Sequence, residues 1–224
     1  MAARLAAAPF APDQPPDRPE EIAALCGRHG AGFTRLVQGI AAYSPFLWRL
    51  AQAHPARLDL FAARPPEASH AEIVAAQRAI GARFASGELS REAAAAELRR
   101  NRAASALLIG LADLGGIRSV DEVTAGLSDF ADASVESATR IALAEAAAAG
   151  KITLSPADGG GSGLVVLALG KHGAGELNYS SDIDLIAFFD PETAPLTGSG
   201  AAGQVYSRIG QAIAKLLQER TADG

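Results

Sequence analysis

Residues 170–185 read GKHGAGELNYSSDIDL, and the two aspartates at the end of this stretch are the strongest indication of the fold. The apolar run from Ile183 to Phe189 contains β-branched and aromatic residues and is closed by Asp190-Pro191, which predicts a buried strand. Side chains alternate along a strand, so Asp182 and Asp184 are expected on one face, roughly 7 Å apart. Two carboxylates beside an apolar run need a physical reason.

A divalent cation between the two acids supplies that reason. Two like charges so close raise each other's pKa and cost stability unless a cation lies between them. Mg²⁺ takes oxygen ligands, keeps several waters and usually binds through one or two carboxylates together with substrate phosphates. Asp182 and Asp184 are therefore predicted to be the metal ligands and the catalytic residues. The alternative is that they only border a turn.

A second apolar run, residues 164–169, predicts another strand that leads into Gly170. Glycines in the turn after it let the backbone approach an anion, whose oxygens accept hydrogen bonds from exposed N–H groups. Gly170, Lys171 and Gly173 are therefore predicted to bind the phosphates of a nucleotide. A turn that needs positive φ, and a surface lysine at a strand end, are the simpler alternatives.

The loop between this turn and the aspartates is rich in residues that favour local hydrogen bonding. Asn178, Ser180 and Ser181 are expected to hydrogen-bond within the loop that feeds the second strand. Ser181 is also assigned to the nucleotide-binding residues. Glu176 is expected to support the turn or to pair with an arginine, without a catalytic role.

A strand, a glycine-containing turn and Asp-x-Asp on the next strand resemble the DNA polymerase β-like nucleotidyltransferases, in which two metals clamp a phosphoryl group during in-line displacement. Residues 170–185 resemble more narrowly the N-terminal, adenylyl-removing half of the bacterial bifunctional glutamine synthetase adenylyltransferase/adenylyl-removing enzymes. The transferase half of that family usually reads ELGYGSDLDL, whereas Asn178 and Ser180 fit the adenylyl-removing half. Further resemblance lies in the segments SPFL (44–47), LRRNR (98–102) and RIGQ (208–211).

This resemblance implies a reaction, a cofactor and partners. Inorganic phosphate attacks the α-phosphorus of an adenylylated tyrosine on glutamine synthetase and ADP is released, with Mg²⁺ held by Asp182 and Asp184. The regulatory PII protein sets the direction of the reaction in the family. A third aspartate, in a VDxRLRP segment, is expected beyond Gly224, so the site is expected to be incomplete here and this piece alone inactive. His172 and Ala174 replace the family's usual apolar residue and glycine.

Other interpretations remain open or are excluded. This chain can instead be a non-catalytic docking fragment, or a relative that adds a nucleotide to another target protein. The glycine cluster 159–163 is not a dinucleotide-binding loop because it precedes the strand instead of following it. The segment GKH at 170–172 lacks the earlier glycine and the Ser/Thr of a Walker loop. Asp129, Asp132 and Glu136 share one helical face, for which a solvated acidic stripe is preferred to a metal site.

Composition indicates a helix-rich protein that acts on another protein. Hydrophobic residues make up 49% of the chain with few aromatics, which favours helices packed through small side chains. The net charge of -5 argues against a nucleic-acid partner, and no segment is apolar and long enough for a bilayer. A single cysteine, Cys26, suits a reducing, cytoplasmic location. With the resemblance, the expected partners are glutamine synthetase, PII, a nucleotide and phosphate, with neither nucleic acid nor membrane.

Local signals divide the chain into three parts. Residues 1–19 indicate a flexible arm, residues 20–150 a helical bundle, and residues 151–224 the first part of a nucleotidyltransferase domain, entered through a flexible glycine-rich joint at 155–163. The expected fold is therefore α+β and helix-rich, with an incomplete polymerase β-like domain.

Capping signals predict where the helices begin and end. Predicted starts are Ser44-Pro45, the capping boxes Ser69–Glu72 and Ser119–Glu122, and a start near Ser90. Predicted ends are Gly87, Gly115-Gly116 and Gly150. The helix from Ser90 is expected to bury Leu98, Ala106, Leu107, Ile109, Leu111 and Leu114. A last helix after Gly203 is expected to cover the sheet with Val205, Ile209, Ala212, Ile213, Leu216 and Leu217.

Overall fold

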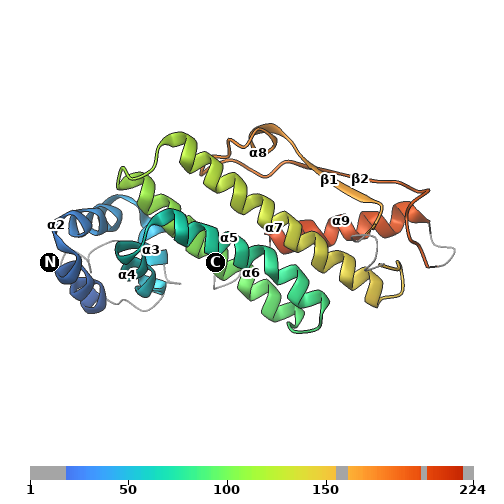
Figure 1. Cartoon of the computed structure of the whole chain (residues 1–224), viewed down its shortest axis with the longest axis horizontal. Helices are drawn as coiled ribbons and strands as arrows, with labels where there is room; N and C mark the ends of the chain where they lie inside the picture. The colour runs from blue at the N-terminus through green and yellow to red at the C-terminus, as the bar shows by residue number, and fades with distance from the viewer. Residues whose placement is uncertain (1–18, 155–160, 198–200, 219–224) are drawn as a thin grey trace. The chain divides into compact units, whose positions relative to one another are not determined.

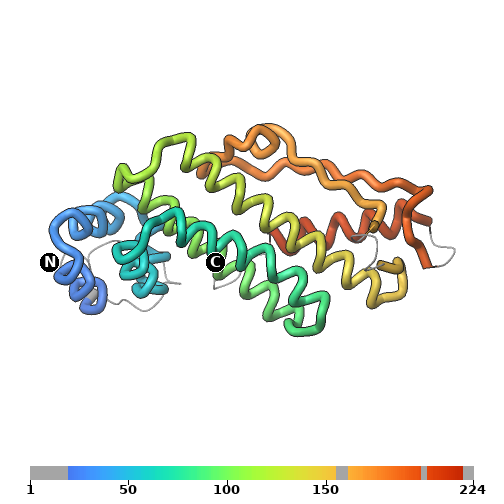
Figure 2. Tube along the Cα trace, viewed as in Figure 1, coloured from blue at the N-terminus to red at the C-terminus, as the bar shows by residue number. Residues whose placement is uncertain are grey.

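The computed structural model describes residues 19–154, 161–197 and 201–218. Its elements, shown in Figure 1 and traced in Figure 2, are α2 (Pro19–Tyr43), α3 (Pro45–Ala53), α4 (Ala56–Ala63), α5 (Pro66–Ala85), α6 (Arg91–Leu114), α7 (Val120–Ala148), β1 (Leu164–Ala168), α8 (Gly170–Gly173), β2 (Leu185–Phe189) and α9 (Ala202–Gln218). The chain forms two compact units. Among the described residues, the first unit comprises 19–73 and 100–123, and the second comprises 74–99 and 124–218.

The first unit packs α2, α3 and α4 with parts of α5 and α6 around its own apolar core. Trp48, Leu58 and Leu107 are each 1% exposed or less. Burying a leucine side chain contributes about 1.5–3 kcal/mol, so a few such residues supply much of the stability of a small unit. At Gly110 of α6, a Cβ would lie 2.8 Å from the side chain of Leu47, so α3 and α6 meet where α6 lacks a side chain.

One of the two predicted capping boxes is confirmed and the other is wrong. The Ser119 N–H donates to Glu122 Oε2 (2.7 Å), and the Glu122 N–H donates to Ser119 Oγ (3.3 Å). This reciprocal pair satisfies two of the backbone donors that the first turn of α7 leaves free. Ser69, by contrast, is buried inside α5, which has already begun, and Glu72 instead accepts a hydrogen bond from Arg64 (2.8 Å).

The other predicted starts are confirmed in position. Helix α3 begins at Pro45, but the Ser44 hydroxyl makes no capping hydrogen bond. Helix α6 begins after Ser90, whose hydroxyl accepts the Ala93 N–H (3.2 Å). Within α6, Leu107 is buried as expected, but Leu114 is 60% exposed, so the predicted apolar face ends before the end of the helix.

The predicted glycine stops are confirmed. Helices α5, α6 and α7 end just before Gly87, Gly116 and Gly150, which have φ of 81°, 65° and 63°. In each case the residue after the glycine donates its N–H to the carbonyl five positions back, as Ile117 does to Ala112 (2.9 Å). The glycine itself donates its N–H to the carbonyl three positions back, as Gly116 does to Asp113 (2.9 Å). The two hydrogen bonds together form a Schellman motif, which needs a positive φ that glycine adopts without a Cβ clash.

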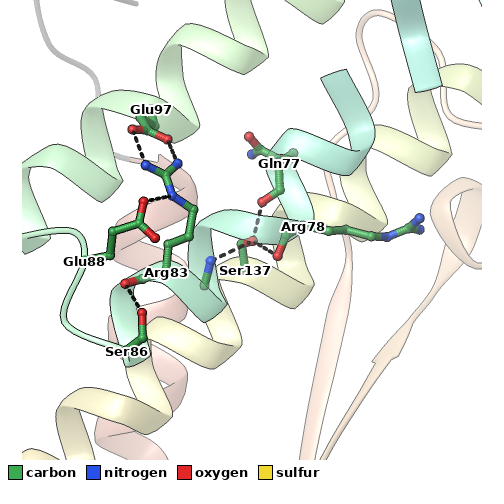
Figure 3. Close-up of polar contacts among 8 residues, drawn as sticks. Gln77, Arg78, Arg83, Ser86, Glu88, Glu97 and Ser137 are labelled. Carbon is green, nitrogen blue, oxygen red and sulfur yellow. Dashed lines mark hydrogen bonds and ion pairs between the residues drawn. The ribbon is translucent and has the colours of Figure 1, made fainter. Parts of the chain in front are cut away.

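In the second unit, α5 and α7 come close enough for a side chain of one to bind the backbone of the other. A Cβ on Gly81 would lie 2.8 Å from the Arg140 Cβ. Figure 3 shows the Ser137 hydroxyl of α7 reaching α5, where its proton is shared between the carbonyls of Gln77 and Arg78. The same oxygen accepts the Gly81 N–H (3.4 Å). The absent side chain and the hydroxyl together set this helix–helix contact.

Ion pairs join α5 to α6 and α6 to α7 in the second unit. Arg83 of α5 donates to Glu88 (2.6 Å) and to Glu97 of α6 (2.6 Å), as Figure 3 shows. Arg91 of α6 donates to Glu145 of α7 (2.8 Å). The pairs Arg83–Glu97 and Arg91–Glu145 are partly buried, so solvent screens them less than it screens a fully exposed pair.

Strands β1 and β2 form an antiparallel pair in which Leu164 lies opposite Phe189. The pairing continues beyond the strands, because the Leu169 N–H donates to the Asp184 carbonyl (2.9 Å). The predicted strands are thus confirmed in place. The prediction that the aspartates lie on the strand is wrong in detail, since Asp182 and Asp184 both precede β2, which begins at Leu185.

Helix α9 packs against the end of this sheet where Leu164 pairs with Phe189, so the predicted contact with the sheet is confirmed there. Ile209 and Ile213 of α9 are buried in a core that includes Phe189 of β2. The Tyr206 ring stacks on Phe189 with centroids 4.7 Å apart and planes 2° from parallel. The Tyr206 hydroxyl donates to the Ser162 carbonyl, so this side chain ties α9 both to β2 and to the segment that enters β1.

The opposite face of the sheet, formed by Val165, Leu167, Ile186 and Phe188, is called the outer face here. These side chains are 54%, 47%, 40% and 53% exposed. The prediction that the strand after Asp182 is buried is therefore wrong, since no residue of β2 is fully buried. A two-stranded sheet with a helix on one side buries only the residues that face the helix, so a continuous apolar sequence does not prove burial on both faces.

The helix-rich architecture with a small sheet is consistent with the predicted α+β class. The ranges 1–19, 20–150 and 151–224 and the polymerase β-like domain stay predictions. Residues 1–18 of the expected arm and residues 155–160 of the expected joint lie outside the described residues. The end of that joint is held in place, because buried Ser162 accepts the Leu164 N–H (3.2 Å). Among the helices described, none has the length and apolar character of a membrane span.

Candidate functional site

The predicted glycine turn forms the short helix α8 and lies directly beside the second aspartate. Gly170 has φ of 56°, and a Cβ there would lie 3.3 Å from Asp184 Oδ2. Gly173 approaches the end of β1 even more closely, since its Cβ would lie 2.5 Å from the Ala168 carbonyl oxygen. The structure therefore brings Gly170 beside Asp184 and Gly173 against the end of β1, and at Gly173 the backbone leaves no room for a side chain.

The two aspartates are available as ligands. Asp182 and Asp184 are exposed, and within the described ranges neither carboxylate makes a hydrogen bond or an ion pair. Over the same ranges, no group of three or more His, Cys, Asp or Glu side chains is placed to hold a metal ion. Two carboxylates are a set that Mg²⁺ accepts when waters and substrate phosphates complete its oxygen ligands. The residues present therefore fit Mg²⁺ as a partial site.

The other predicted nucleotide-binding residues, Lys171 and Ser181, have no contact with either carboxylate among the interactions of the described residues. Lys171 is exposed on α8, and its carbonyl accepts the Glu176 N–H (2.8 Å), which closes the turn. The Ser181 hydroxyl donates to Asn178 Oδ1 (2.8 Å), so it belongs to the loop network. Their binding of a nucleotide stays a prediction.

The predicted hydrogen bonding within the loop is confirmed. Asn178 Oδ1 accepts both the Ser180 N–H (3.1 Å) and the Ser181 hydroxyl (2.8 Å). The Asn178 N–H donates in turn to Ser181 Oγ (3.3 Å). One amide side chain thus organises the turn that leads the chain to Asp182.

The contact between His172 and Asp132 was not predicted from the sequence. The His172 side chain is 1% exposed, and its Nε2 lies 2.8 Å from Asp132 Oδ1 of α7. Glu136, from the same predicted acidic stripe, lies 3.2 Å from Arg78 Nε. All three acids of the predicted stripe are exposed, so the prediction of a solvated stripe is confirmed, although Asp132 and Glu136 each also contact a partner. No local spacing signals the His172–Asp132 contact, because 40 residues separate its partners.

Comparison with known proteins agrees with the motif. The family model described as glutamate-ammonia ligase adenylyltransferase matches residues 33–224. A bifunctional glutamine synthetase adenylyltransferase/adenylyl-removing enzyme of Xanthobacter autotrophicus is 45% identical over 212 residues, which cover 92% of this chain and 21% of that protein. A protein of the same description from Bradyrhizobium sp. is 42% identical to this chain over 239 residues, which cover 100% of this chain and 24% of that protein. Another from Rhizobium meliloti is 41% identical over 186 residues, which cover 82% of this chain and 19% of that protein. The chain thus spans about a fifth to a quarter of the length of these curated relatives.

Proposed function

Because the chain belongs to the glutamate-ammonia ligase adenylyltransferase family, we propose that it forms the beginning of the adenylyl-removing half of a bifunctional enzyme that acts on glutamine synthetase. The relatives carry both activities in their names. Asn178 and Ser180 favour the adenylyl-removing half, because the transferase half usually has glycine at both positions. The nucleotidyltransferase domain is proposed to have a polymerase β-like fold, and PII to regulate the reaction.

The proposed reaction is the phosphorolysis of an adenylylated tyrosine. An oxygen of inorganic phosphate forms a bond to the α-phosphorus of the attached AMP, the bond from that phosphorus to the tyrosine oxygen breaks, ADP leaves, and the tyrosine oxygen takes up a proton. Phosphate is already an anion at pH 7 and a tyrosine phenol has a pKa of about 10, so the reaction needs charge stabilisation more than a strong base.

The observation that carries this proposal is the position of Asp184 against the glycine turn. The exposed carboxylates of Asp182 and Asp184 have no partner among the described residues, and Gly170 lies beside Asp184 with no side chain between them. Mg²⁺ bound here would supply positive charge to the phosphoryl group in transfer. The two aspartates hold that ion, while Gly170, Lys171, Gly173 and Ser181 bind the nucleotide or phosphate.

A docking fragment that is inactive by itself is the second candidate function. The observation in its favour is that, within the described ranges, two carboxylates and no larger metal-binding group gather near the turn. On this view the helical part contacts glutamine synthetase, and a further ligand comes from elsewhere in the longer polypeptide that the relatives possess. Both candidates expect the 224-residue chain alone to be inactive, so they differ in whether ADP release appears when about 30 further downstream residues are added.

The test compares acid variants in the complete enzyme that carries this stretch. Asp182→Asn and Asp184→Asn are expected to lower ADP release from adenylylated glutamine synthetase and phosphate by at least about a hundredfold, with the fold intact, because each removes a metal ligand. Glu176→Gln is the matched control, since it neutralises an exposed acid of the same loop. Wild-type turnover in either asparagine variant would refute the proposal.

A further inference from the structure

We infer that His172 of α8 and Asp132 of α7 form a positioning pair that fixes the glycine turn beside Asp184. Both residues belong to the second unit. The effect of the pair on metal affinity rests on the proposed function, whereas its effect on the conformation of the turn does not. Neither residue touches the reacting atoms, so the pair acts through the backbone that it holds.

The first step is the contact itself. The imidazole of His172 is buried, and its Nε2 lies 2.8 Å from an Asp132 carboxylate oxygen. A carboxylate only accepts, so Nε2 is the donor in this hydrogen bond. Nδ1 is also buried and has no partner in the described part of the chain. A buried polar ring with one hydrogen bond is held in place by that bond, because moving the ring would leave both nitrogens without a partner.

The second step is a further attachment of the same turn to the same helix. The Leu177 N–H, beyond the end of α8, donates to the Ser128 hydroxyl of α7 (3.1 Å). That hydroxyl donates in turn to the Thr124 carbonyl (2.8 Å), which orients its lone pair toward Leu177. Ser128 lies one helical turn before Asp132, so α7 holds the turn at two points on one side of the helix.

The third step connects the turn to the acid. The Gly173 N–H donates to the Leu169 carbonyl (2.9 Å), and the Leu169 N–H donates to the Asp184 carbonyl (2.9 Å). The Gly170 backbone in between approaches the Asp184 carboxylate. A displacement of α8 away from α7 therefore reaches Asp184 through two backbone hydrogen bonds and one close contact.

Amide hydrogen exchange of the 224-residue chain, followed by NMR, tests the pair without any metal. Asp132→Ala removes the acceptor from a half-exposed position, and His172→Phe removes the donor but keeps a buried ring. In both variants the amide hydrogens of Leu169 and Glu176 are expected to exchange about tenfold faster. A tenfold change corresponds to roughly 1.4 kcal/mol in the free energy of local opening. Asp132→Asn keeps an acceptor oxygen and is expected to restore wild-type exchange. The matched control Asp129→Ala alters an exposed acid of the same helix and is expected to change nothing.

A general loss of stability gives a different pattern from loss of the pair. Faster exchange confined to Leu169 and Glu176 supports the inference, whereas equal acceleration in α9 means that the variant loosens the whole unit and overturns it. The double variant Asp132→Ala/His172→Phe is expected to exchange no faster than either single variant, because one hydrogen bond is lost once. Additive effects would also overturn the inference.

Mn²⁺ binding, measured by electron paramagnetic resonance as a probe of the Mg²⁺ site, gives the readout that rests on the proposed function. Asp132→Ala is expected to weaken Mn²⁺ affinity about fivefold, and Asp132→Asn to restore it. Unchanged Mn²⁺ affinity together with locally faster amide exchange would show that the pair holds the turn but has no effect on Asp184, which overturns that part of the inference. If neither the wild-type chain nor the complete enzyme that carries it binds Mn²⁺ at these acids, the proposed metal site fails, and the exchange data still decide whether the pair holds the turn.

Discussion

Replacement of Gly173 by alanine tests the closest backbone approach in the candidate site. The Cβ of an alanine would lie 2.5 Å from the Ala168 carbonyl oxygen and 3.0 Å from the Ala168 carbonyl carbon. Ordinary contacts begin at 3.4 Å, so the turn and the end of β1 must move apart by about 0.9 Å. Both atoms belong to the backbone of a strand residue, and neither has a flexible side chain to turn aside. We expect the free energy of unfolding to fall by roughly 1–3 kcal/mol, the usual cost of overpacking.

The assay is urea unfolding of Gly173→Ala beside Gly210→Ala. Gly210 lies in α9, and nothing lies within 4 Å of the position of its Cβ, so alanine there is expected to stabilise the chain by about 0.5–1 kcal/mol through helix propensity. The two variants share the same chemical change and differ only in the space available. If Gly173→Ala is as stable as Gly210→Ala, the close approach does not exist in solution and the reasoning about the turn is refuted.

Two further predictions concern the helices. Ser137→Ala removes the hydroxyl that donates to the Gln77 carbonyl and accepts the Gly81 N–H. The variant should lower the free energy of unfolding in urea titrations by roughly 0.5–1.5 kcal/mol, the usual net contribution of a hydrogen bond. Ser207→Ala on the exposed side of α9 should change it little, and equal midpoints would contradict the buried contact. The second prediction concerns Glu122, whose pKa lies below its ordinary value of 4.5 because the Ser119 N–H and hydroxyl donate to its carboxylate. A lowered folded-state pKa gives stability that is present above the unfolded-state pKa and is lost as pH falls through the folded-state pKa. Glu122→Ala should therefore be less stable than wild type at pH 7, by a margin that shrinks below about pH 4.5, and a margin independent of pH would exclude the carboxylate as its source.

Local chemistry was sufficient to predict the features that depend on neighbours in sequence. The Ser119–Glu122 box and the Gly116 and Gly150 stops are confirmed because each needs only a few consecutive residues. The box at Ser69 failed because α5 begins before it, and a helix that has begun no longer needs a cap there. Capping chemistry thus predicts a helix start only where no earlier start is available.

Contacts between distant residues were beyond the reach of sequence patterns. The predicted common face of Asp182 and Asp184 rests on local alternation, but the attachment of His172 to Asp132 depends on which side of α7 the turn lies. Tyr206 shows the same limit, because its stacking on Phe189 follows from the crossing of α9 and β2. The apolar runs predicted both strands, yet they gave no information on which face would remain exposed.

The exposed outer face of the sheet has a consequence for the electrostatics of the acids. Two-residue alternation from Phe188 through Ile186 leads to Asp184, so the carboxylate borders the apolar surface. Any segment that settles on that surface displaces water from one side of the carboxylate. Fewer water dipoles then screen its charge, and the same acid attracts a cation more strongly than it does in open solvent.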